Sequence, residues 1–191
     1  MEKIPIIQPD SDFLILIDIQ NDLLPGGANP VPTGHLVLEP IYRIYPLFHN
    51  LLVAILTHFP NDPAIQQKPY CLLGTMGAEF PKEILTFFRG GRENNKIFTV
   101  ILTRNHNDGF IRDNRMAKFL RGRGCKRVFI GGLPLEKNVK DIALHLKDAG
   151  FDTVILEDAT KASNQQAGAF AKQDLQIAGI KFLRTSELFK E

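Results

Sequence analysis

The chain has 191 residues, of which 44% are hydrophobic and 23% are charged. That length can bury one sizeable core and is short for two independent units, so we expect a single domain over residues 1–191. The formal net charge of +2 at pH 7 gives no strongly basic field for nucleic acid or an anionic membrane. The composition therefore favours a small-molecule ligand over either of those partners.

The apolar runs and the cysteines indicate the cellular compartment of the protein. The runs at residues 13–17 and 51–57 are too short to span a bilayer, and the N-terminus lacks a basic segment followed by a signal-type apolar stretch. Cys71 and Cys125 lie far apart without paired spacing, which indicates reduced thiols rather than a disulfide framework or a zinc site. We expect a cytoplasmic protein without a membrane partner.

Short runs rich in Ile, Val, Leu and Phe predict the strands of a sheet. They are continuously apolar rather than alternating, as strands covered on both faces require, and helix-like stretches lie between most of them. The runs cover residues 13–17, 51–57, 97–103, 127–130, 153–156 and 180–183. This pattern predicts an α/β fold with a doubly wound, mostly parallel six-stranded sheet and helices on both faces.

Two segments between the predicted strands have the apolar stripe of a helix that packs on a sheet. The stripes comprise Val37, Ile41, Ile44, Tyr45 and Phe48 in the first segment, and Val139, Ile142, Ala143, Leu146 and Ala149 in the second. Pro46 predicts a kink at the end of the first helix, and Gly150 is placed to close the second. Ser163 with Gln166 predicts the capped start of a third helix.

A carboxylate follows the first predicted strand directly. In open α/β sheets, ligands bind outside the carboxyl ends of the strands, and Asp18 ends a buried strand there. Partial desolvation would raise the pKa of such a carboxyl and suit it to general base catalysis. The alternative is that Asp18 only accepts hydrogen bonds from backbone N–H groups of the following loop.

Several motifs resemble one enzyme family. Residues 18–22 read Asp-Ile-Gln-Asn-Asp and are followed by Pro-Gly-Gly at 25–27, which resembles the opening motif of nicotinamidases. Residues 71–79, Cys-Leu-Leu-Gly-Thr-Met-Gly-Ala-Glu, are similar to the Cys-Val-Gln-Gly-Thr-Pro-Gly-Ala-Glu loop of that branch. Residues 131–139 align with the family's Gly-Leu-Ala-Thr-Asp-Tyr-Cys-Val segment. The chain thus resembles the nicotinamidase and pyrazinamidase branch of the isochorismatase-like cysteine hydrolases, which implies a Rossmann-type three-layer fold and a homo-oligomer.

The resemblance also implies a catalytic triad that this chain does not complete. Asp18 stands at the position of the family's acid, but Thr103 stands at the lysine position and Asn138 at the position of the nucleophilic cysteine. A carboxamide has no ionisable nucleophile, so the thioester intermediate of the family cannot form on Asn138. We expect little or none of the family's amide hydrolysis.

The family's metal ligands, an Asp-x-His and a second His, align with Thr57, Phe59 and Tyr70. Neutral oxygens and a phenyl group cannot replace a carboxylate and two imidazoles around a transition metal. We therefore expect no metal and no other cofactor. One alternative stays open. A one-residue shift in register at this strand end would turn the His58 side chain into the site.

The resemblance further implies which residues line the pocket. They are Leu24, Phe59, Tyr70, Phe110, Leu133 and Pro134. The family has a cis peptide bond in the segment that aligns with Leu133 and Pro134, and a cis bond costs much less before proline than before other residues. We predict a cis Leu133–Pro134 bond; the alternative is that Pro134 is the first residue of the following helix.

Residues 106–108, His-Asn-Asp, precede a glycine and fall in the same region. His106 and Asp108 could form a new acid–base pair, but the composition is more typical of a solvated turn.

Three functional hypotheses follow. The leading one is a catalytically degraded family member that binds a small molecule or a partner. The alternative is an active small-molecule hydrolase, acting on an amide or an isochorismate-type vinyl ether, that uses Asp18 without a cysteine nucleophile. A third is an interaction protein that acts through self-association.

Overall fold

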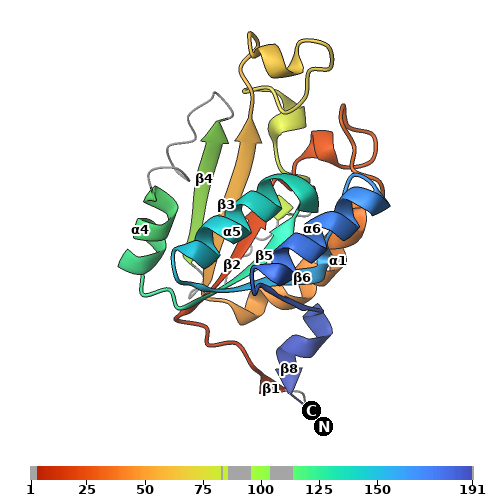
Figure 1. Ribbon diagram of the computed structural model, residues 1–191. Helices are drawn as coiled ribbons and strands as arrows, with labels where there is room; N and C mark the ends of the chain where they lie inside the picture. The colour runs from red at the N-terminus through yellow and green to blue at the C-terminus, as the bar shows by residue number, and fades with distance from the viewer. Residues whose placement is uncertain (1–3, 83, 86–95, 104–113, 191) are drawn as a thin grey trace.

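A six-stranded sheet forms the centre of the molecule (Figure 1). The computed structural model describes residues 4–82, 84–85, 96–103 and 114–190. The strands are β2 (Asp12–Ile17), β3 (Asn50–Thr57), β4 (Lys96–Thr103), β5 (Arg127–Gly132), β6 (Asp152–Thr160) and β7 (Lys181–Leu183). Their order is β4-β3-β2-β5-β6-β7, and every neighbouring pair is parallel. The predicted doubly wound, six-stranded sheet is confirmed.

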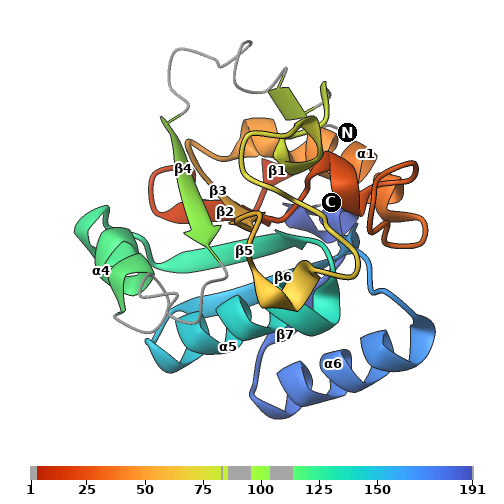
Figure 2. The same cartoon turned by 90° about the horizontal axis from the view of Figure 1, so that it is seen from above.

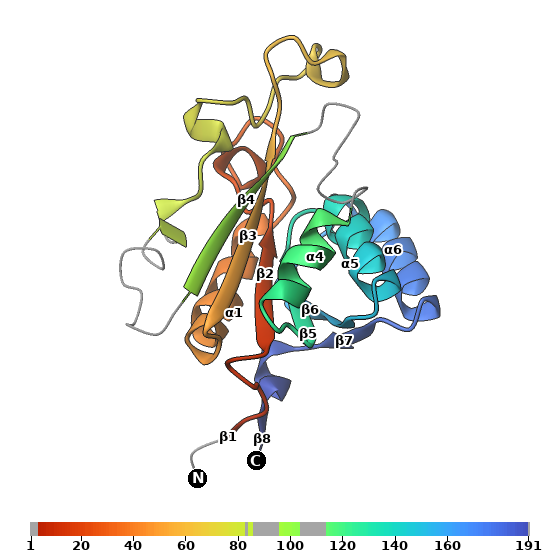
Figure 3. The ribbon, with the colours of Figure 1, turned by 90° about the vertical axis from the view of Figure 1, so that its left-hand side faces the viewer.

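Helices cover both faces of this sheet (Figures 2 and 3). Helix α1 (Leu38–Ile44) lies on one face. Helices α4 (Arg115–Gly122), α5 (Lys140–Asp148) and α6 (Gln165–Ile177) lie on the other. This arrangement is the predicted three-layer fold, in which central strands such as β2 are buried on both sides.

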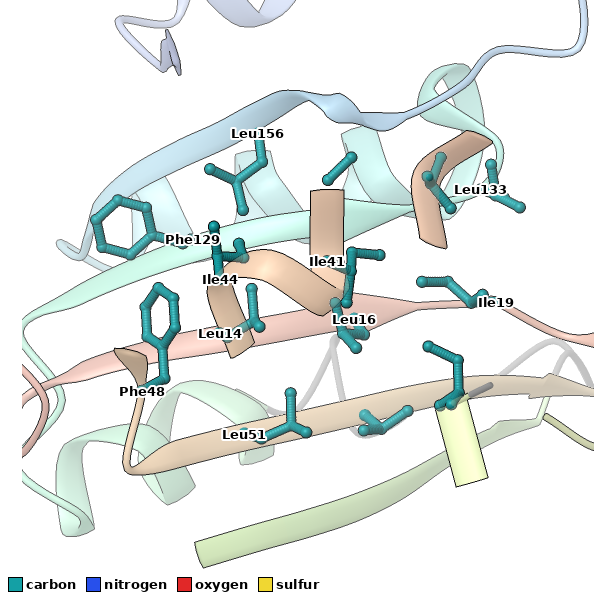
Figure 4. Close-up of a cluster of buried hydrophobic side chains, with 14 of the residues drawn as sticks. Leu14, Leu16, Ile19, Ile41, Ile44, Phe48, Leu51, Phe129, Leu133 and Leu156 are labelled. Atoms are coloured by element: carbon teal, nitrogen blue, oxygen red, sulfur yellow. The ribbon is translucent and has the colours of Figure 1, made fainter. Parts of the chain in front are cut away.

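Strand β2 shows why its sequence is continuously apolar. All of its residues are buried, and they alternate between the two cores. Leu14 and Leu16 pack in the core under α1, whereas Phe13, Ile15 and Ile17 pack in the core under α4 and α5. Figure 4 shows the α1 side, where Ile41 and Ile44 approach the two leucines.

The predicted ends of α1 and α5 agree with the structure, and the predicted start of α6 does not. Pro46 lies in the short turn η3 (Tyr45–Leu47), where α1 ends. Gly150 has φ +90° after α5, a conformation that glycine adopts without steric cost. For α6 the predicted cap is one residue wrong: the Asn164 side chain, rather than Ser163, accepts a hydrogen bond from the N–H of Ala167 at 2.8 Å. No helix among the residues described is long and apolar enough to cross a membrane.

Short elements complete the chain. Strands β1 (Ile4–Pro5) and β8 (Phe189–Lys190) form an antiparallel ribbon that brings the chain ends together (Figure 1). The short turns are η1 (Asn21–Leu23), η2 (Gly34–Val37), η4 (Pro63–Ile65), η5 (Met76–Ala78), the wide π-type turn η6 (Leu135–Val139) and η7 (Thr185–Leu188).

The strand order places a ligand site between β2 and β5. The chain runs from β2 outward to β3 and β4, then returns to the other side of β2 with β5. At such a switch point the loops after the two central strands diverge and leave a crevice. Gly132 keeps the two strand ends close, because a Cβ at this residue would lie 2.2 Å from the backbone oxygen of Ile17.

Candidate functional site

A cavity of about 80 Å³ lies at this switch point. Its lining comes from the segments after β2 and β5, from the end of β3, and from the loop that follows β3. The residues are Asp18, Leu23, Asn29, Pro30, Val31, Leu56, Tyr70, Pro134, Lys137, Asn138 and Ser163. The structure thus brings together Asp18, Tyr70, Pro134 and Asn138 from the predicted set.

Asp18 is held at the cavity floor by its backbone. It is the first residue after β2 and adopts a left-handed conformation with φ 54°. Its N–H donates to the backbone oxygen of Ala54 at 2.9 Å, which continues the pairing of β2 with β3. The residue has no solvent-exposed surface, so the environment of its carboxylate is set by the neighbouring side chains.

Asn138 is the side chain that approaches Asp18. Its Nδ2 donates to Asp18 Oδ2 at 2.6 Å. Asn138 lies in η6, directly before α5. At the position that resembles the family's nucleophile, the structure therefore places a hydrogen-bond donor to the acid.

The backbone before Asn138 follows the prediction. The Leu133–Pro134 bond is cis. Pro134 has an extended conformation (φ −80°, ψ 153°) and precedes the first residue of η6, so the alternative of Pro134 as the first helical residue is wrong. The N–H of Leu133 donates to the Ile17 oxygen at 3.0 Å, which ties this segment to β2.

Three predicted pocket residues do not line the cavity. Leu23, the last residue of η1, lines the cavity, whereas its neighbour Leu24 does not. Leu133 is fully buried in the core under α1. The side chain of Phe59 is turned towards solvent and is 39% exposed. These three predicted pocket residues thus lie outside the lining of this cavity.

The structure gives less information about two other predicted site residues, Thr103 and Phe110. Thr103 is the last residue of β4 and is in register with Thr57 of β3. Phe110, and the proposed pair His106 and Asp108, lie outside the residues described by the structure.

The metal-ligand positions do not fit a transition metal. Thr57 is a buried hydroxyl residue at the end of β3, Phe59 has no donor atom, and Tyr70 offers only a phenol. His58 is buried, and its Nδ1 lies 2.6 Å from Oδ2 of Asp62. Among the residues described, no three His, Cys, Asp or Glu side chains form a metal-binding group.

His58 does not take the place of a missing ligand. It does not line the cavity, and its ring packs edge-on against Tyr70, with centroids 4.8 Å apart. The one-residue slip that would turn His58 into the site is therefore wrong. Instead, His58 pairs with Asp62 and packs against Tyr70, which itself lines the cavity.

Cys71 is close to Asp18 but is unsuited to nucleophilic attack. Burial raises the pKa of its thiol, and the charges of Asp18 and Asp22 raise the pKa further. Its N–H donates to Oδ2 of Asp22 at 2.7 Å. A protonated thiol is a weak nucleophile, so Cys71 does not replace the missing cysteine.

Sequence reasoning missed Lys137 and Ser163, which line the cavity beside Asn138. The Ser163 hydroxyl donates to a carboxylate oxygen of Glu136. It is available for this bond because Asn164 caps α6 instead. The only sign of this in the sequence is that Asn164, next to Ser163, is an equally good helix cap and can leave the Ser163 side chain for another contact.

Together, these features define a doubly wound α/β protein with a cavity at its switch point. The isochorismatase domain family matches residues 12–187, and the chain belongs to this family.

Several relatives indicate the branch. A nicotinamidase from Acinetobacter baylyi is 21% identical over 94% of this chain and 95% of its own. The zinc complex of a pyrazinamidase from Pyrococcus horikoshii has a TM-score of 0.71 and 26% identity, covering 91% of this chain and 99% of that chain. A protein from L. infantum in complex with nicotinate has a TM-score of 0.79 and 24% identity, covering 94% and 96%. The predicted resemblance to the nicotinamidase and pyrazinamidase branch is confirmed.

Proposed function

We propose that this chain is a catalytically inactive member of the isochorismatase family that binds a small molecule in the cavity at Asp18. The observation that carries the proposal is the 2.6 Å hydrogen bond from Asn138 Nδ2 to Asp18 Oδ2. This hydrogen bond links Asn138, at the position of the family's nucleophile, to Asp18, at the position of the acid. An amide at the nucleophile's position cannot form the covalent intermediate.

The chemistry of Asn138 supports inactivity. Nucleophilic catalysis requires a group that an adjacent base can activate or that ionises at neutral pH. The carboxamide nitrogen of Asn138 does neither. Its hydrogen bond to Asp18 therefore places a group that cannot ionise beside the acid.

The other thiol near the site supports the same view. The charge of Asp18 reaches Cys71, but burial and this charge raise the pKa of the thiol and keep it protonated near neutral pH. The metal-ligand positions also lack the imidazoles that would activate water. The described part of the site therefore offers no evident replacement for the lost cysteine.

The binding role rests on the remaining cavity. Polar and apolar residues share the walls of this cavity, as is usual in a small-molecule pocket. The polar residues are Asp18, Asn29, Tyr70, Lys137, Asn138 and Ser163, and the apolar ones are Leu23, Pro30, Val31, Leu56 and Pro134. Similar proteins are a nicotinamidase and a pyrazinamidase, and one similar structure contains nicotinate. We propose that the pocket has kept ligand binding without turnover.

Ammonia release tests the inactive assignment. Purified protein is incubated with nicotinamide and with pyrazinamide, and ammonia is measured by a coupled assay. We expect no release above that of buffer, whereas turnover near 1–10³ s⁻¹, roughly the range of ordinary enzymes, would contradict the proposal. Such a result would instead support the alternative, a hydrolase that uses Asp18 without a cysteine.

The variant Asn138→Cys serves as the internal comparison, alone and combined with Thr103→Lys. If the absence of these two side chains causes inactivity, the double variant should release ammonia measurably above the parent protein. Circular dichroism checks that each variant is folded.

The proposal includes a cytoplasmic protein that forms one domain over residues 1–191 and associates with itself. Light scattering of the purified protein measures its molar mass, and a monomer at micromolar concentration would contradict self-association. Cell fractionation tests the location.

A further inference from the structure

We infer that the protein has a second binding site, for a small organic phosphate monoester, in a groove between β6, α6 and β7. The groove measures about 600 Å³, which lies within the usual range of small-molecule sites. It shares no lining residue with the cavity at Asp18. Lys161 and Ala162 line the groove and the next residue, Ser163, lines the cavity, so the two sites are neighbours in the fold.

The acids that line the groove already have partners. The carboxylate of Glu157 forms an ion pair with Lys172. The carboxylate of Asp158 accepts from the N–H of Thr185 at 2.9 Å and from its hydroxyl at 2.7 Å. The negative charge of the groove is therefore matched by protein groups.

Two cations of the groove have no such match. Lys161 and Arg184 both line it, and neither forms an ion pair with any residue in the described part of the chain. Lys161 directly follows β6 and Arg184 directly follows β7. These strands are parallel neighbours, so both cations lie beyond carboxyl ends of the sheet, where α/β proteins bind ligands. Two like charges in one groove repel each other, and a bound anion would stabilise both.

The pair of cations favours a phosphate monoester over other anions. Such a group has a charge of about −1.5 to −2 at pH 7 and three strong acceptor oxygens. The guanidinium group of Arg184 can donate to two of these oxygens at once, and lysine is a common phosphate ligand. A single carboxylate would bring only one negative charge to Lys161 and Arg184.

The remaining lining favours an organic group attached to the phosphate. Leu135, Ala162 and the ring of Phe182 contribute apolar surface to the groove. The ammonium group of Lys172 lies 5.2 Å from the centre of the Phe182 ring, so this lysine is engaged with Phe182 and Glu157. Inorganic phosphate would fill only part of the groove, whereas a phosphorylated small molecule would also cover the apolar part.

A matched pair of probes tests the site by isothermal titration calorimetry. AMP and adenosine differ only in the phosphate group. We expect AMP to bind the parent protein at least about tenfold more tightly than adenosine, which corresponds to ~1.4 kcal/mol. Inorganic phosphate should bind more weakly than AMP, because it lacks the organic group.

Lys161→Met and Arg184→Met should each weaken binding of AMP by about threefold or more, since each removes one charge partner at a partly open site. Binding of adenosine should stay nearly unchanged. Lys118→Met is the matched control, because Lys118 is an exposed lysine of α4 outside the groove. It should keep the parental affinity for AMP, and circular dichroism checks that every variant is folded.

Equal binding of AMP and adenosine, no binding of AMP, or AMP binding that survives both groove variants would overturn the inference. Lys137→Met separates the groove from the cavity at Asp18, which Lys137 lines. We expect this variant to bind AMP like the parent protein. A loss of AMP binding in Lys137→Met would place the phosphate in the cavity instead and would also overturn the inference.

Discussion

Two walls of the cavity differ in what they share with the family motif. The central wall comprises Asp18 and residues 132–138, at the ends of β2 and β5. The loop wall comprises residues 58–72, which rise above the end of β3 (Figure 1). The central wall has the special backbone that the motif resemblance implies, including the cis bond before Pro134. The loop wall instead contains a buried His58–Asp62 pair next to Phe59 and Thr57, two of the positions that align with the family's metal ligands.

This difference shows that backbone and chemistry are constrained separately. The central wall depends on close backbone contacts, such as that of Gly132 with Ile17, which few other residues permit. A side chain at the cavity surface, such as Asn138, can be changed without disturbing those contacts. The pocket can therefore retain its shape after the residues for catalysis have been replaced.

The largest effect is expected from Gly132→Ala. At φ +147°, the added Cβ would lie 2.2 Å from the Ile17 oxygen, so the ends of β2 and β5 would have to separate. We expect a loss of at least about 3 kcal/mol in the free energy of unfolding. Urea denaturation measures this loss.

Gly122→Ala is the matched control for this change. Gly122 ends α4, and a Cβ there would meet no atom within 4 Å. Alanine is the better helix former by about 1 kcal/mol, so this variant should be equally or slightly more stable. A Gly132→Ala protein of parental stability would show that the central wall is less tightly constrained than its contacts indicate.

A smaller effect is expected from His58→Ala, which tests the loop wall. The variant removes one hydrogen-bond partner of the buried Asp62 and the ring that packs against Tyr70. We expect a loss of about 2–4 kcal/mol, because the change leaves a cavity and takes a hydrogen bond from a buried carboxylate.

The chain offers a matched exposed pair. His49 Nδ1 lies 2.9 Å from Oδ1 of Asp10, whose side chain is 95% exposed. Exposed pairs contribute little, so His49→Ala should change stability by less than about 1 kcal/mol. If both histidine variants behaved alike, the buried pair would not be what holds the loop wall in place.

The same contrast explains how much the sequence predicted. Apolar runs predicted the strands, since a parallel strand such as β2 must be covered on both faces. Proline and glycine fixed local features, including the cis bond before Pro134 and the end of α5 at Gly150. These features depend on residues close in the chain, so a local pattern can identify them.

Side-chain direction around the cavity could not be predicted in the same way. Leu23 rather than Leu24 lines it, and Phe59 points towards solvent, because the direction depends on turns such as η1. Lys137 faces the cavity only because its backbone departs from helical values. The His58–Asp62 contact spans a single turn, but nothing in the sequence showed that both residues are buried.

The last comparison concerns the reactivity of the two buried thiols. For these we expect the smallest effect on stability. Cys71 follows Tyr70 on the loop wall, and Cys125 lies near β5, away from the cavity. Burial raises the pKa of the Cys125 thiol to about 12 and also raises the pKa of the Cys71 thiol, to which Asp18 and Asp22 contribute. Since only the thiolate reacts rapidly, we expect iodoacetamide at pH 8 to modify neither cysteine in the native protein.

Unfolding in urea restores ordinary thiol pKa values of about 8.5, so both cysteines should then react, and mass spectrometry of the digested protein reports each site. The sign for stability follows from the same shift. Because the native state favours the protonated thiols, stability should be unaffected below about pH 8 and should fall as the pH rises above the unfolded pKa. Rapid modification of Cys71 alone in the native protein would mean that a thiolate forms beside Asp18, and the loop wall would then supply the nucleophile that Asn138 lacks.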